Sequence, residues 1–345
     1  MNQPAAQQIR LTSSERADFD LSATAPRNLD MRPYLQHVQE YGIFVVFIIE
    51  FLFFALTSEH FLTPANLINV TLQTSIIAII AVGMTFVILT AGIDLSVGSL
   101  VALTGVIAAW ILKFNLPPEI GLSLAIAGGL LVGALSGALA GFFITTFRVT
   151  PFITTLALMT IWRGLAYIWA EGRPIWGLPP IFDGLGSARI FEIPFPSLVM
   201  LVVYLLAWFT LQHTKFGRNV YAVGGNAEAA RLAGIATRKT LLFVYIICGA
   251  LASLSGILLA SRMSSGQPNA GQMYELDVIA AVVVGGTSLF GGRGSVVGTF
   301  IGAMLIGVLR NGLNLTGVGS YVQQVVLGVV ILLAVLLDQL KKREI

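Results

Sequence analysis

Residues whose types could make or break bonds are few and scattered in this sequence. The three histidines, His37, His60 and His213, lie far apart, and the single cysteine, Cys248, sits within an apolar run. The sequence shows no Ser-His-Asp arrangement, no paired carboxylates and no Cys/His cluster, which are the patterns of hydrolases and metal sites. We therefore expect no enzymatic activity, and we interpret Cys248 as a small packed side chain.

Two glycine-rich stretches are of the kind that can bind the phosphate of a nucleotide. They are Gly285-Gly286-Thr287 and Gly291-Gly292-Arg293-Gly294-Ser295. A Walker A loop needs Lys followed by Ser or Thr after its glycines, and neither stretch has this pair. We interpret the glycines as close helix packing and a tight turn, and we expect no cofactor on this chain.

Three ionisable residues lie in or beside apolar runs. Asp94, in Gly92-Ile93-Asp94-Leu95-Ser96, is predicted to cap the helix that follows, with a substrate or proton site as the alternative. Glu50 falls within the first apolar run, where a charge is costly, so it is a functional candidate without an assigned role. Arg163 lies deep in another run, although a long side chain can reach toward the interface.

The elements that must position these residues are transmembrane helices. Of 345 residues, 56% are hydrophobic and only 11% charged, and the mean hydropathy is +0.85. A soluble domain has about 25% charged residues, so this composition predicts an all-α, polytopic transmembrane helical bundle. A span needs about 20 apolar residues. About ten spans are expected, at 42–58, 68–89, 95–112, 121–146, 151–170, 197–213, 240–260, 276–290, 295–311 and 321–338.

The basic residues predict the orientation of this bundle. With both termini in the cytoplasm, most of the 20 Lys and Arg residues fall in inside segments, as the positive-inside rule requires. Residues 1–41 are then a mostly disordered cytoplasmic tail, 42–338 the membrane domain, and 339–345 a basic cytoplasmic tail. The longest inside loop covers about 214–239.

This inside loop predicts a short helix. Gly224 and Gly225 indicate a turn, and Asn226 is expected to cap a helix over 227–233. Glu228 falls in its first turn, where the helix dipole favours an anion, and Gly234 is the expected stop. The plainer alternative is a solvated surface helix that only connects two spans.

A resemblance to a known family extends this interpretation. Glu228-Ala229-Ala230-x-x-x-Gly234 resembles the EAA loop of ABC-importer permeases, although Ile235-Ala236-Thr237-Arg238 replaces that family's I-x-L-P. Two longer stretches, Ala81–Gly105 and Tyr274–Val318, closely resemble the membrane subunit of bacterial ribose-type monosaccharide ABC importers. The resemblance runs from about Phe61 to Asp338. It implies that an ATPase couples to this loop through Gly225, Asn226, Glu228, Ala229, Ala230 and Gly234.

The resemblance also implies a function, a location and partners. The chain is expected to be the permease subunit of an ATP-driven importer in the bacterial inner membrane, where it works by alternating access. The resemblance also implies that two copies of the permease form a homodimer surrounded by lipid. A cytoplasmic ABC ATPase would bind ATP and Mg, and a periplasmic or lipid-anchored protein would deliver the sugar; no nucleic acid is expected. The alternatives are a self-contained secondary sugar transporter, a branched-chain amino-acid permease and a membrane scaffold or receptor component.

A sugar path needs hydroxyl, amide and aromatic groups, because sugars form hydrogen bonds and present flat apolar faces. Polar residues inside the predicted spans are the candidates, although each could instead join two helices by hydrogen bonds. They are Asn69, Gln73, Thr74, Thr154, Thr155, Asn311, Asn314 and Gln323.

Overall fold

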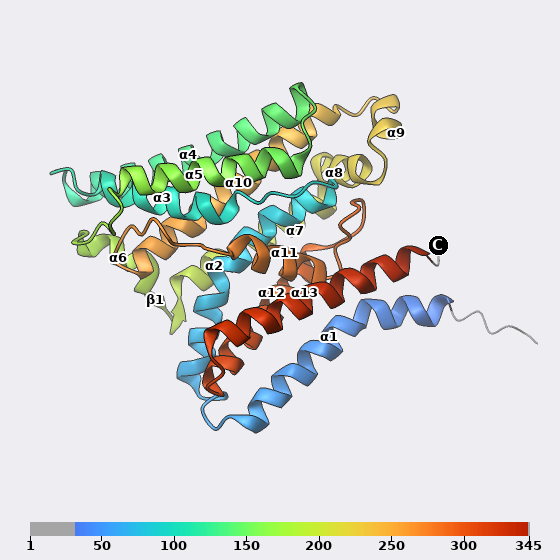
Figure 1. The fold of residues 1–345 in the computed structure, drawn as a ribbon, viewed down its shortest axis with the longest axis horizontal. Helices are drawn as coiled ribbons and strands as arrows, with labels where there is room; N and C mark the ends of the chain where they lie inside the picture. The colour runs from blue at the N-terminus through green and yellow to red at the C-terminus, as the bar shows by residue number, and fades with distance from the viewer. Residues whose placement is uncertain (1–31, 344–345) are drawn as a thin grey trace, which may run out of the picture. The chain divides into compact units, whose positions relative to one another are not determined.

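The computed structural model describes residues 32–343, and the side chains of 42–336. The regular elements of this part are helices apart from one short antiparallel hairpin, β1–β2, in which Ile190 pairs with Ile193. Residues up to Tyr41 and those from Gly42 onward form separate units, and the description below concerns the second. The elements are α1 Arg32–Thr57, α2 Pro64–Leu89, α3 Val97–Ile111, α4 Pro118–Thr146, α5 Pro151–Trp169, α6 Pro180–Ser187, β1 Arg189–Ile190, β2 Ile193–Pro194, α7 Phe195–His213, α8 Lys215–Gly225, α9 Ala227–Leu232, α10 Thr237–Arg262, α11 Tyr274–Val284, α12 Val296–Leu315 and α13 Ser320–Arg343 (Figure 1).

The all-helical prediction is confirmed, and a helix lies at each predicted span. Six helices in the described chain, α2, α4, α5, α7, α10 and α12, are long and apolar enough to cross a membrane. Shorter apolar helices cover Gly42–Thr57, Val97–Ile111 and Ser320–Leu336. Because α1 begins at Arg32, its first turns fall within the predicted tail. The rest of that tail, 1–31, and the last residues of the predicted basic tail lie outside the described residues.

The helix α11 differs from the span predicted at 276–290. It has 11 residues and ends at Val284, so at 1.5 Å per residue it is about 16 Å long. That is about half of the ~30 Å hydrocarbon core. Hydropathy did not reveal this, because Leu289 and Phe290 in the loop after α11 extend the apolar run.

The helix α2 is the central element of the bundle. Its second half, from Thr74 to Leu89, is buried throughout. It packs against α10, α12, α7 and α11, whose own apolar residues belong to the same core cluster. Cys248 of α10 is buried and free, and it lies against Gly83 of α2, which confirms its interpretation as a packed side chain.

Glycines bring α4 and α10 into backbone contact. A Cβ atom at Gly137 would overlap the Tyr245 carbonyl oxygen and lie 2.6 Å from the carbonyl carbon. Gly133 is pressed in the same way against the Gly249 carbonyl, and Ser253 Oγ donates a 2.7 Å hydrogen bond to the Gly129 carbonyl. In a membrane, where lipid is as apolar as Leu, such close packing is a main source of helix association.

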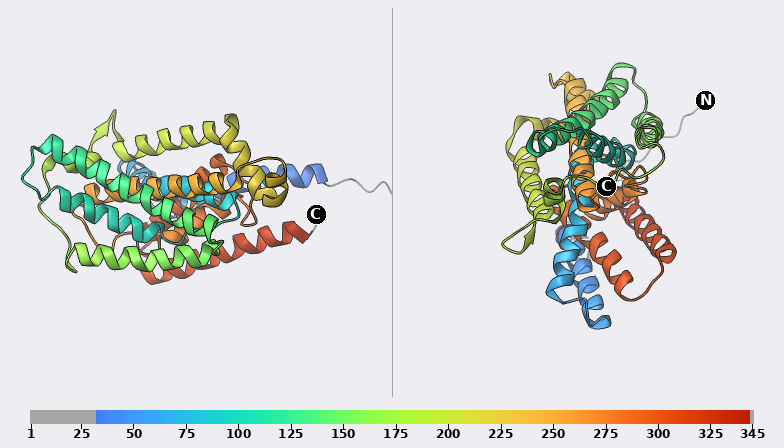
Figure 2. Two further views of the ribbon diagram at one scale, coloured as in Figure 1. Left: turned by 90° about the horizontal axis from the view of Figure 1, so that it is seen from above. Right: turned by 90° about the vertical axis from the view of Figure 1, so that its left-hand side faces the viewer.

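The loops gather at two opposite ends of the unit (Figures 1 and 2). One end, called the α9 end, holds α8, α9 and the loop of 285–295. The other, the α6 end, holds α6 and the hairpin. Lys113 Nζ lies there and donates a 3.2 Å hydrogen bond to the Gly177 carbonyl, and Ile175 forms a backbone bridge with Gly266.

Two helices begin after non-helical segments and meet at their first turns. The segment 90–96 precedes α3, and 263–273 precedes α11. A Cβ atom at Gly98, in the first turn of α3, would overlap both the Gly271 carbonyl oxygen and the Glu275 carboxylate. Short helices that start within a bundle, at related places in two halves of a transporter, are the usual builders of substrate sites.

Candidate functional site

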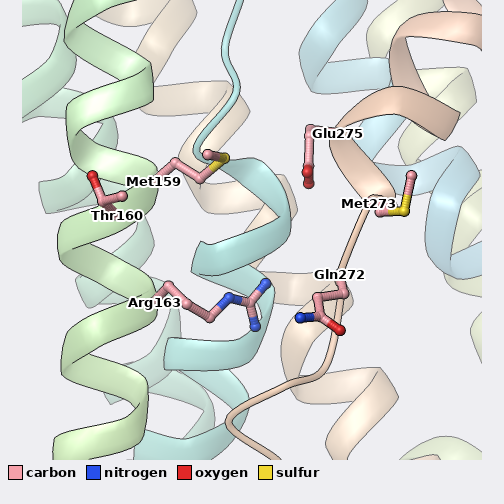
Figure 3. Close-up of a pocket in the computed structure, with 6 residues that line it drawn as sticks. All are labelled: Met159, Thr160, Arg163, Gln272, Met273 and Glu275. Carbon is pink, nitrogen blue, oxygen red and sulfur yellow. The ribbon is translucent and has the colours of Figure 1, made fainter.

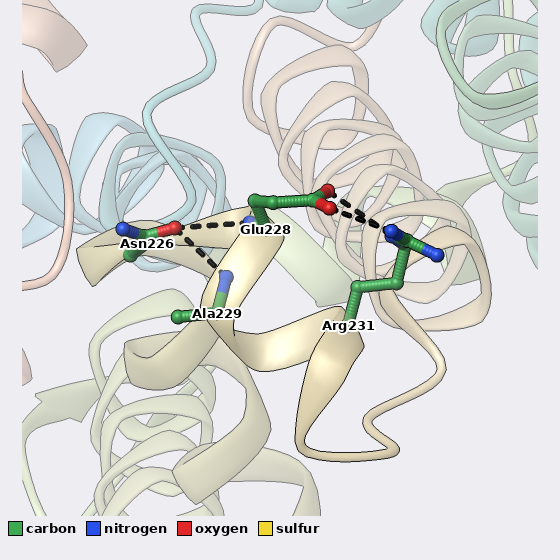
Figure 4. Close-up of polar contacts among 4 residues, drawn as sticks. All are labelled: Asn226, Glu228, Ala229 and Arg231. Carbon is green, nitrogen blue, oxygen red and sulfur yellow. Dashed lines mark hydrogen bonds and ion pairs between the residues drawn. The ribbon is translucent and has the colours of Figure 1, made fainter.

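The helix α9 has the caps that the sequence predicts. Asn226 Oδ1 accepts hydrogen bonds from the amides of Glu228 at 3.0 Å and Ala229 at 2.9 Å (Figure 4). At the other end Gly234 takes φ +84°, and the amide of Ile235 donates to the Ala230 carbonyl at 3.0 Å. This is the Schellman arrangement, in which a left-handed glycine closes a helix.

The charges on α9 face solvent. Arg231 Nη2 and Nε donate to the two Glu228 carboxylate oxygens at 2.6 and 3.0 Å (Figure 4). These hydrogen bonds lower the pKa of Glu228, which is fully exposed and therefore ionised at neutral pH. Leu232 on α9 is 74% exposed, a large apolar side chain without cover in the described chain.

A pocket of about 190 Å³ lies between α5 and the start of α11. It is lined by Met159, Thr160, Arg163, Gln272, Met273 and Glu275 (Figure 3). Arg163 points from α5 toward Gln272, while the Glu275 carboxylate lies across the same gap. Hydrogen-bonding groups beside the flexible, apolar side chains of two methionines match the mixed polar and apolar surface of a sugar.

Arg163 also holds the backbone that forms the pocket. Its Nη1 donates to the carbonyls of Pro268 at 2.8 Å and Ala270 at 2.7 Å. Arg163 and Glu275 form no ion pair with each other in the described structure. Their opposite charges therefore face a shared space in which a ligand with hydroxyl groups could accept from the one and donate to the other.

The backbone at the start of α11 is strained. Met273 occupies the N-cap position with φ +64°, a left-handed conformation uncommon for a non-glycine residue. One turn further, Arg310 Nη2 of α12 donates to Asp277 Oδ1 of α11 at 2.5 Å. Strain of this kind concentrates at functional sites because the surrounding contacts must over-determine it.

The sequence-predicted path residues lie elsewhere and mostly bind protein groups. Thr154 and Thr155 donate to the carbonyls of Thr150 and Ile93, at 3.1 and 3.2 Å. Thr74 is buried against Gly307. The amides pair with protein groups, Gln73 with Asn69, Asn311 with Asn66, and Gln323 with the Val318 carbonyl, whereas the Asn314 side chain is exposed. None of the eight lines the pocket, and their contact with a substrate stays a prediction.

The predicted cap at Asp94 has a different local geometry. Asp94 Oδ1 accepts from the Ser96 amide at 2.8 Å and the Ser96 hydroxyl at 2.6 Å, and Ser96 itself occupies the N-cap of α3. Asp94 therefore shapes the turn that leads into the helix and does not bind a helix amide. Glu50 lies on α1 with both carboxylate oxygens shielded and without a hydrogen-bond partner in the described chain.

Sequence reasoning noticed Arg163 but missed Gln272 and Glu275. Gln272 and Glu275 are close together in the chain but far from Arg163, and they meet it only because 263–273 folds back beside α5. The available signal was the run Ser264–Met273, which interrupts two apolar segments with small and polar residues.

Comparisons with known proteins agree with this architecture. Residues 66–335 match the family described as branched-chain amino acid transport system / permease component. The chain is 50% identical to the ribose import permease protein RbsC of Escherichia coli K12, over 83% of this chain and 89% of that protein. It is 45% identical to RbsC of Bacillus subtilis, over 88% and 94%, and 38% identical to the D-allose transport system permease protein AlsC of Escherichia coli, over 87% and 92%.

No solved structure matches the chain. The family match covers most of the sequence, and the relatives align over nearly their whole length, including both the α9 segment and the pocket. The chain therefore belongs to the branched-chain amino acid transport system / permease component family, together with the ribose import permeases.

Proposed function

We propose that this chain is the membrane permease subunit of an ATP-driven ABC importer for a ribose-type monosaccharide. The observation that carries the proposal is the 50% identity to a ribose import permease over 89% of that protein. The pocket, in which Arg163 and Glu275 face each other, supports a substrate rich in hydroxyl groups. The chain itself makes and breaks no bonds, and ATP with Mg is held by a separate ATPase.

In this proposal the α9 end faces the cytoplasm of a bacterium, and both chain termini lie inside. The α9 end carries Lys215, Arg218, Arg231 and Arg293 on α8, α9 and the neighbouring loop, which is the positive-inside pattern. That orientation leaves α9 accessible to a cytoplasmic ATPase. The α6 end then faces the periplasm and receives sugar from a binding protein.

Transport proceeds by alternating access across a pair of permease subunits. ATP binding draws the two ATPase domains together, and each carries the α9 helix of its permease with it. The bundle then changes the side to which the pocket opens, as in other transitions in which packed elements have two discrete arrangements. Arg163 and Glu275 bind the sugar hydroxyls weakly enough for release on the other side.

Uptake into proteoliposomes tests the proposal. The permease is reconstituted with its ATPase and binding protein, and entry of radiolabelled ribose is measured with and without ATP. We expect uptake only when both ATP and the ATPase are present, and we expect competition by allose or arabinose to exceed competition by leucine. Uptake by the permease alone under a proton gradient would instead establish a secondary transporter, and preference for leucine an amino-acid permease.

Replacement of Gly234 tests whether α9 couples to the ATPase. In Gly234→Leu, the backbone of the new residue must adopt the left-handed conformation that closes α9, which distorts the helix end. The substitution also adds a bulky side chain to the exposed surface. We expect ATPase co-purification and sugar uptake to fall at least about fivefold, because a misplaced contact of about 1 kcal/mol already gives this factor.

Gly172→Leu is the matched control for this change. Gly172 has φ +72° and, like Gly234, open space around it, but it lies on the α6 end. The same backbone strain there should leave ATPase binding intact. Equal binding and uptake in both variants would remove the coupling role of Gly234.

A further inference from the structure

Three chain segments meet backbone to backbone at the α9 end. They are the end of α8 at Gly224, the end of α2 with the turn that follows it, and the loop between α11 and α12. The amide of Gly292 donates a 2.9 Å hydrogen bond to the Leu89 carbonyl oxygen, which joins the second segment to the third. The end of α8 lies against this hydrogen bond.

The contact excludes any side chain at the meeting point. A Cβ atom at Gly224 would overlap the Leu89 carbonyl oxygen and lie 2.7 Å from the Gly292 amide nitrogen. One at Gly292 would lie 2.8 Å from the Gly225 Cα, and one at Gly291 would lie 2.9 Å from the Ala91 nitrogen. Both loop glycines have positive φ, +81° and +73°. We call Gly224, Leu89, Gly291 and Gly292 the glycine junction.

Backbone contacts of this kind transmit displacement because they have no flexible side chain to yield. Two further contacts from α8 reinforce the junction. Tyr221 of α8 donates a 2.9 Å hydrogen bond to the Gly294 carbonyl of the loop, and Phe216 of α8 stacks on Phe86 of α2 with ring centroids 6.2 Å apart. Asn226 ends α8 and is also the N-cap of α9, so the two helices follow each other without a linker. Movement of α9 is therefore passed to the junction.

Two routes lead from the junction to the pocket. One runs back along the loop to the C-terminal end of α11 and along this helix to its first turn, which carries Glu275. The other runs from the end of α2 through 90–96 into α3, whose first turn carries Gly98. The routes converge, since Gly98 is packed against Gly271 and Glu275 without room for a Cβ atom. A shift of either helix start must therefore move the Glu275 side of the pocket relative to Arg163.

We propose that the glycine junction is the mechanical link that passes displacement of α9 to α2 and α11, and through them opens or closes the pocket. Gly224 and Tyr221 are then positioning residues, which touch neither ATP nor sugar. This proposal rests on the proposed function of the chain as an ATP-driven permease. It adds where, inside the permease, ATPase movement becomes a change at the substrate pocket.

The test measures coupling separately from binding and folding. The complete importer is reconstituted with wild-type permease, Gly224→Ala, Tyr221→Phe or the control Gly328→Ala. Gly328 lies on α13, where a Cβ atom meets nothing within 4 Å. Three quantities are recorded, namely ATPase co-purification, the ATP hydrolysis rate, and the number of ribose molecules taken up per ATP hydrolysed.

We expect Gly224→Ala to retain the ATPase and hydrolyse ATP while uptake per ATP falls about tenfold or more, because overpacking shifts the backbones apart. Tyr221→Phe should lower the ratio about twofold, as expected for one lost hydrogen bond. The Gly328 control should keep the wild-type ratio. Tyr221→Phe removes only one oxygen atom and should leave the fold intact. It therefore decides the outcome if Gly224→Ala does not insert into the membrane.

The results separate failure of the junction from failure of the proposed function. A wild-type complex without ATP-dependent ribose uptake would overturn the proposed function itself. With a working wild type, an unchanged ratio in Tyr221→Phe, or in folded Gly224→Ala, overturns the junction. Loss of ATPase binding in Gly224→Ala also overturns it, because Gly224 would then belong to the docking surface.

Discussion

Replacing Arg163 with methionine is expected to reduce ribose uptake at least about tenfold while ATPase binding persists. The change removes the hydrogen bonds to the Pro268 and Ala270 carbonyls, which hold the segment before α11. It also removes the positive group that faces Glu275 across the pocket. A hydrogen bond to a charged group contributes about 1.5–3 kcal/mol, and 1.4 kcal/mol corresponds to a factor of ten.

Ribose uptake by two further variants distinguishes a role of Arg163 in the pocket from a folding defect. Arg163→Lys keeps the charge but cannot bridge two carbonyls with a rigid guanidinium, so we expect intermediate uptake. Arg189→Met is the control, since Arg189 forms only an exposed 3.7 Å ion pair with Glu192 at the α6 end. Wild-type ribose uptake by Arg163→Met would show that substrate does not pass this pocket.

Replacing Gly137 with valine is expected to destabilise the helix bundle. The Cβ atom would overlap the Tyr245 carbonyl oxygen and lie 2.8 Å from the Ile246 Cα, so α4 could stay only by moving away from α10. Overpacking typically costs about 1–3 kcal/mol, and backbone atoms yield less than side chains. We expect a fall in the detergent-solubilised Tm of at least about 5 °C, or aggregation during purification.

Gly164→Val is the matched control for this prediction. Gly164 lies on α5, is exposed, and has open space where a Cβ atom would go. It therefore measures the intrinsic cost of replacing a helical glycine by valine in the same chain. If both variants melt at the same temperature, the close approach of α4 and α10 contributes nothing to stability.

The short helix α9 shows how far local sequence signals reach. Its N-cap at Asn226, its acidic first turn at Glu228 and its glycine stop at Gly234 all appear in the structure as predicted. These features depend on hydrogen bonds between residues at most five positions apart, so the sequence contains all the information they need. The family resemblance likewise follows from long collinear stretches and is confirmed by the comparisons.

The half-length of α11 and the site of the pocket show where such signals end. Hydropathy averages over a window, so it merges an 11-residue helix with Leu289 and Phe290 of the loop after it. The sequence did not distinguish polar residues that face a path from those that join two helices. In the structure, most of the predicted path residues form hydrogen bonds with protein groups. The pocket instead takes Arg163 from α5 and Glu275 from α11, which no local pattern connects.

By itself, the sequence determined the class of this protein, most of its helices and the capped helix α9, because burial of apolar residues in lipid and local capping act along the chain. The tertiary structure decided which polar groups face a shared space and which glycines touch. Gly224, Leu89 and Gly292 meet only after α2, α8 and the α11–α12 loop have packed. Such contacts depend on the relative placement of whole helices, which side-chain packing between distant segments sets.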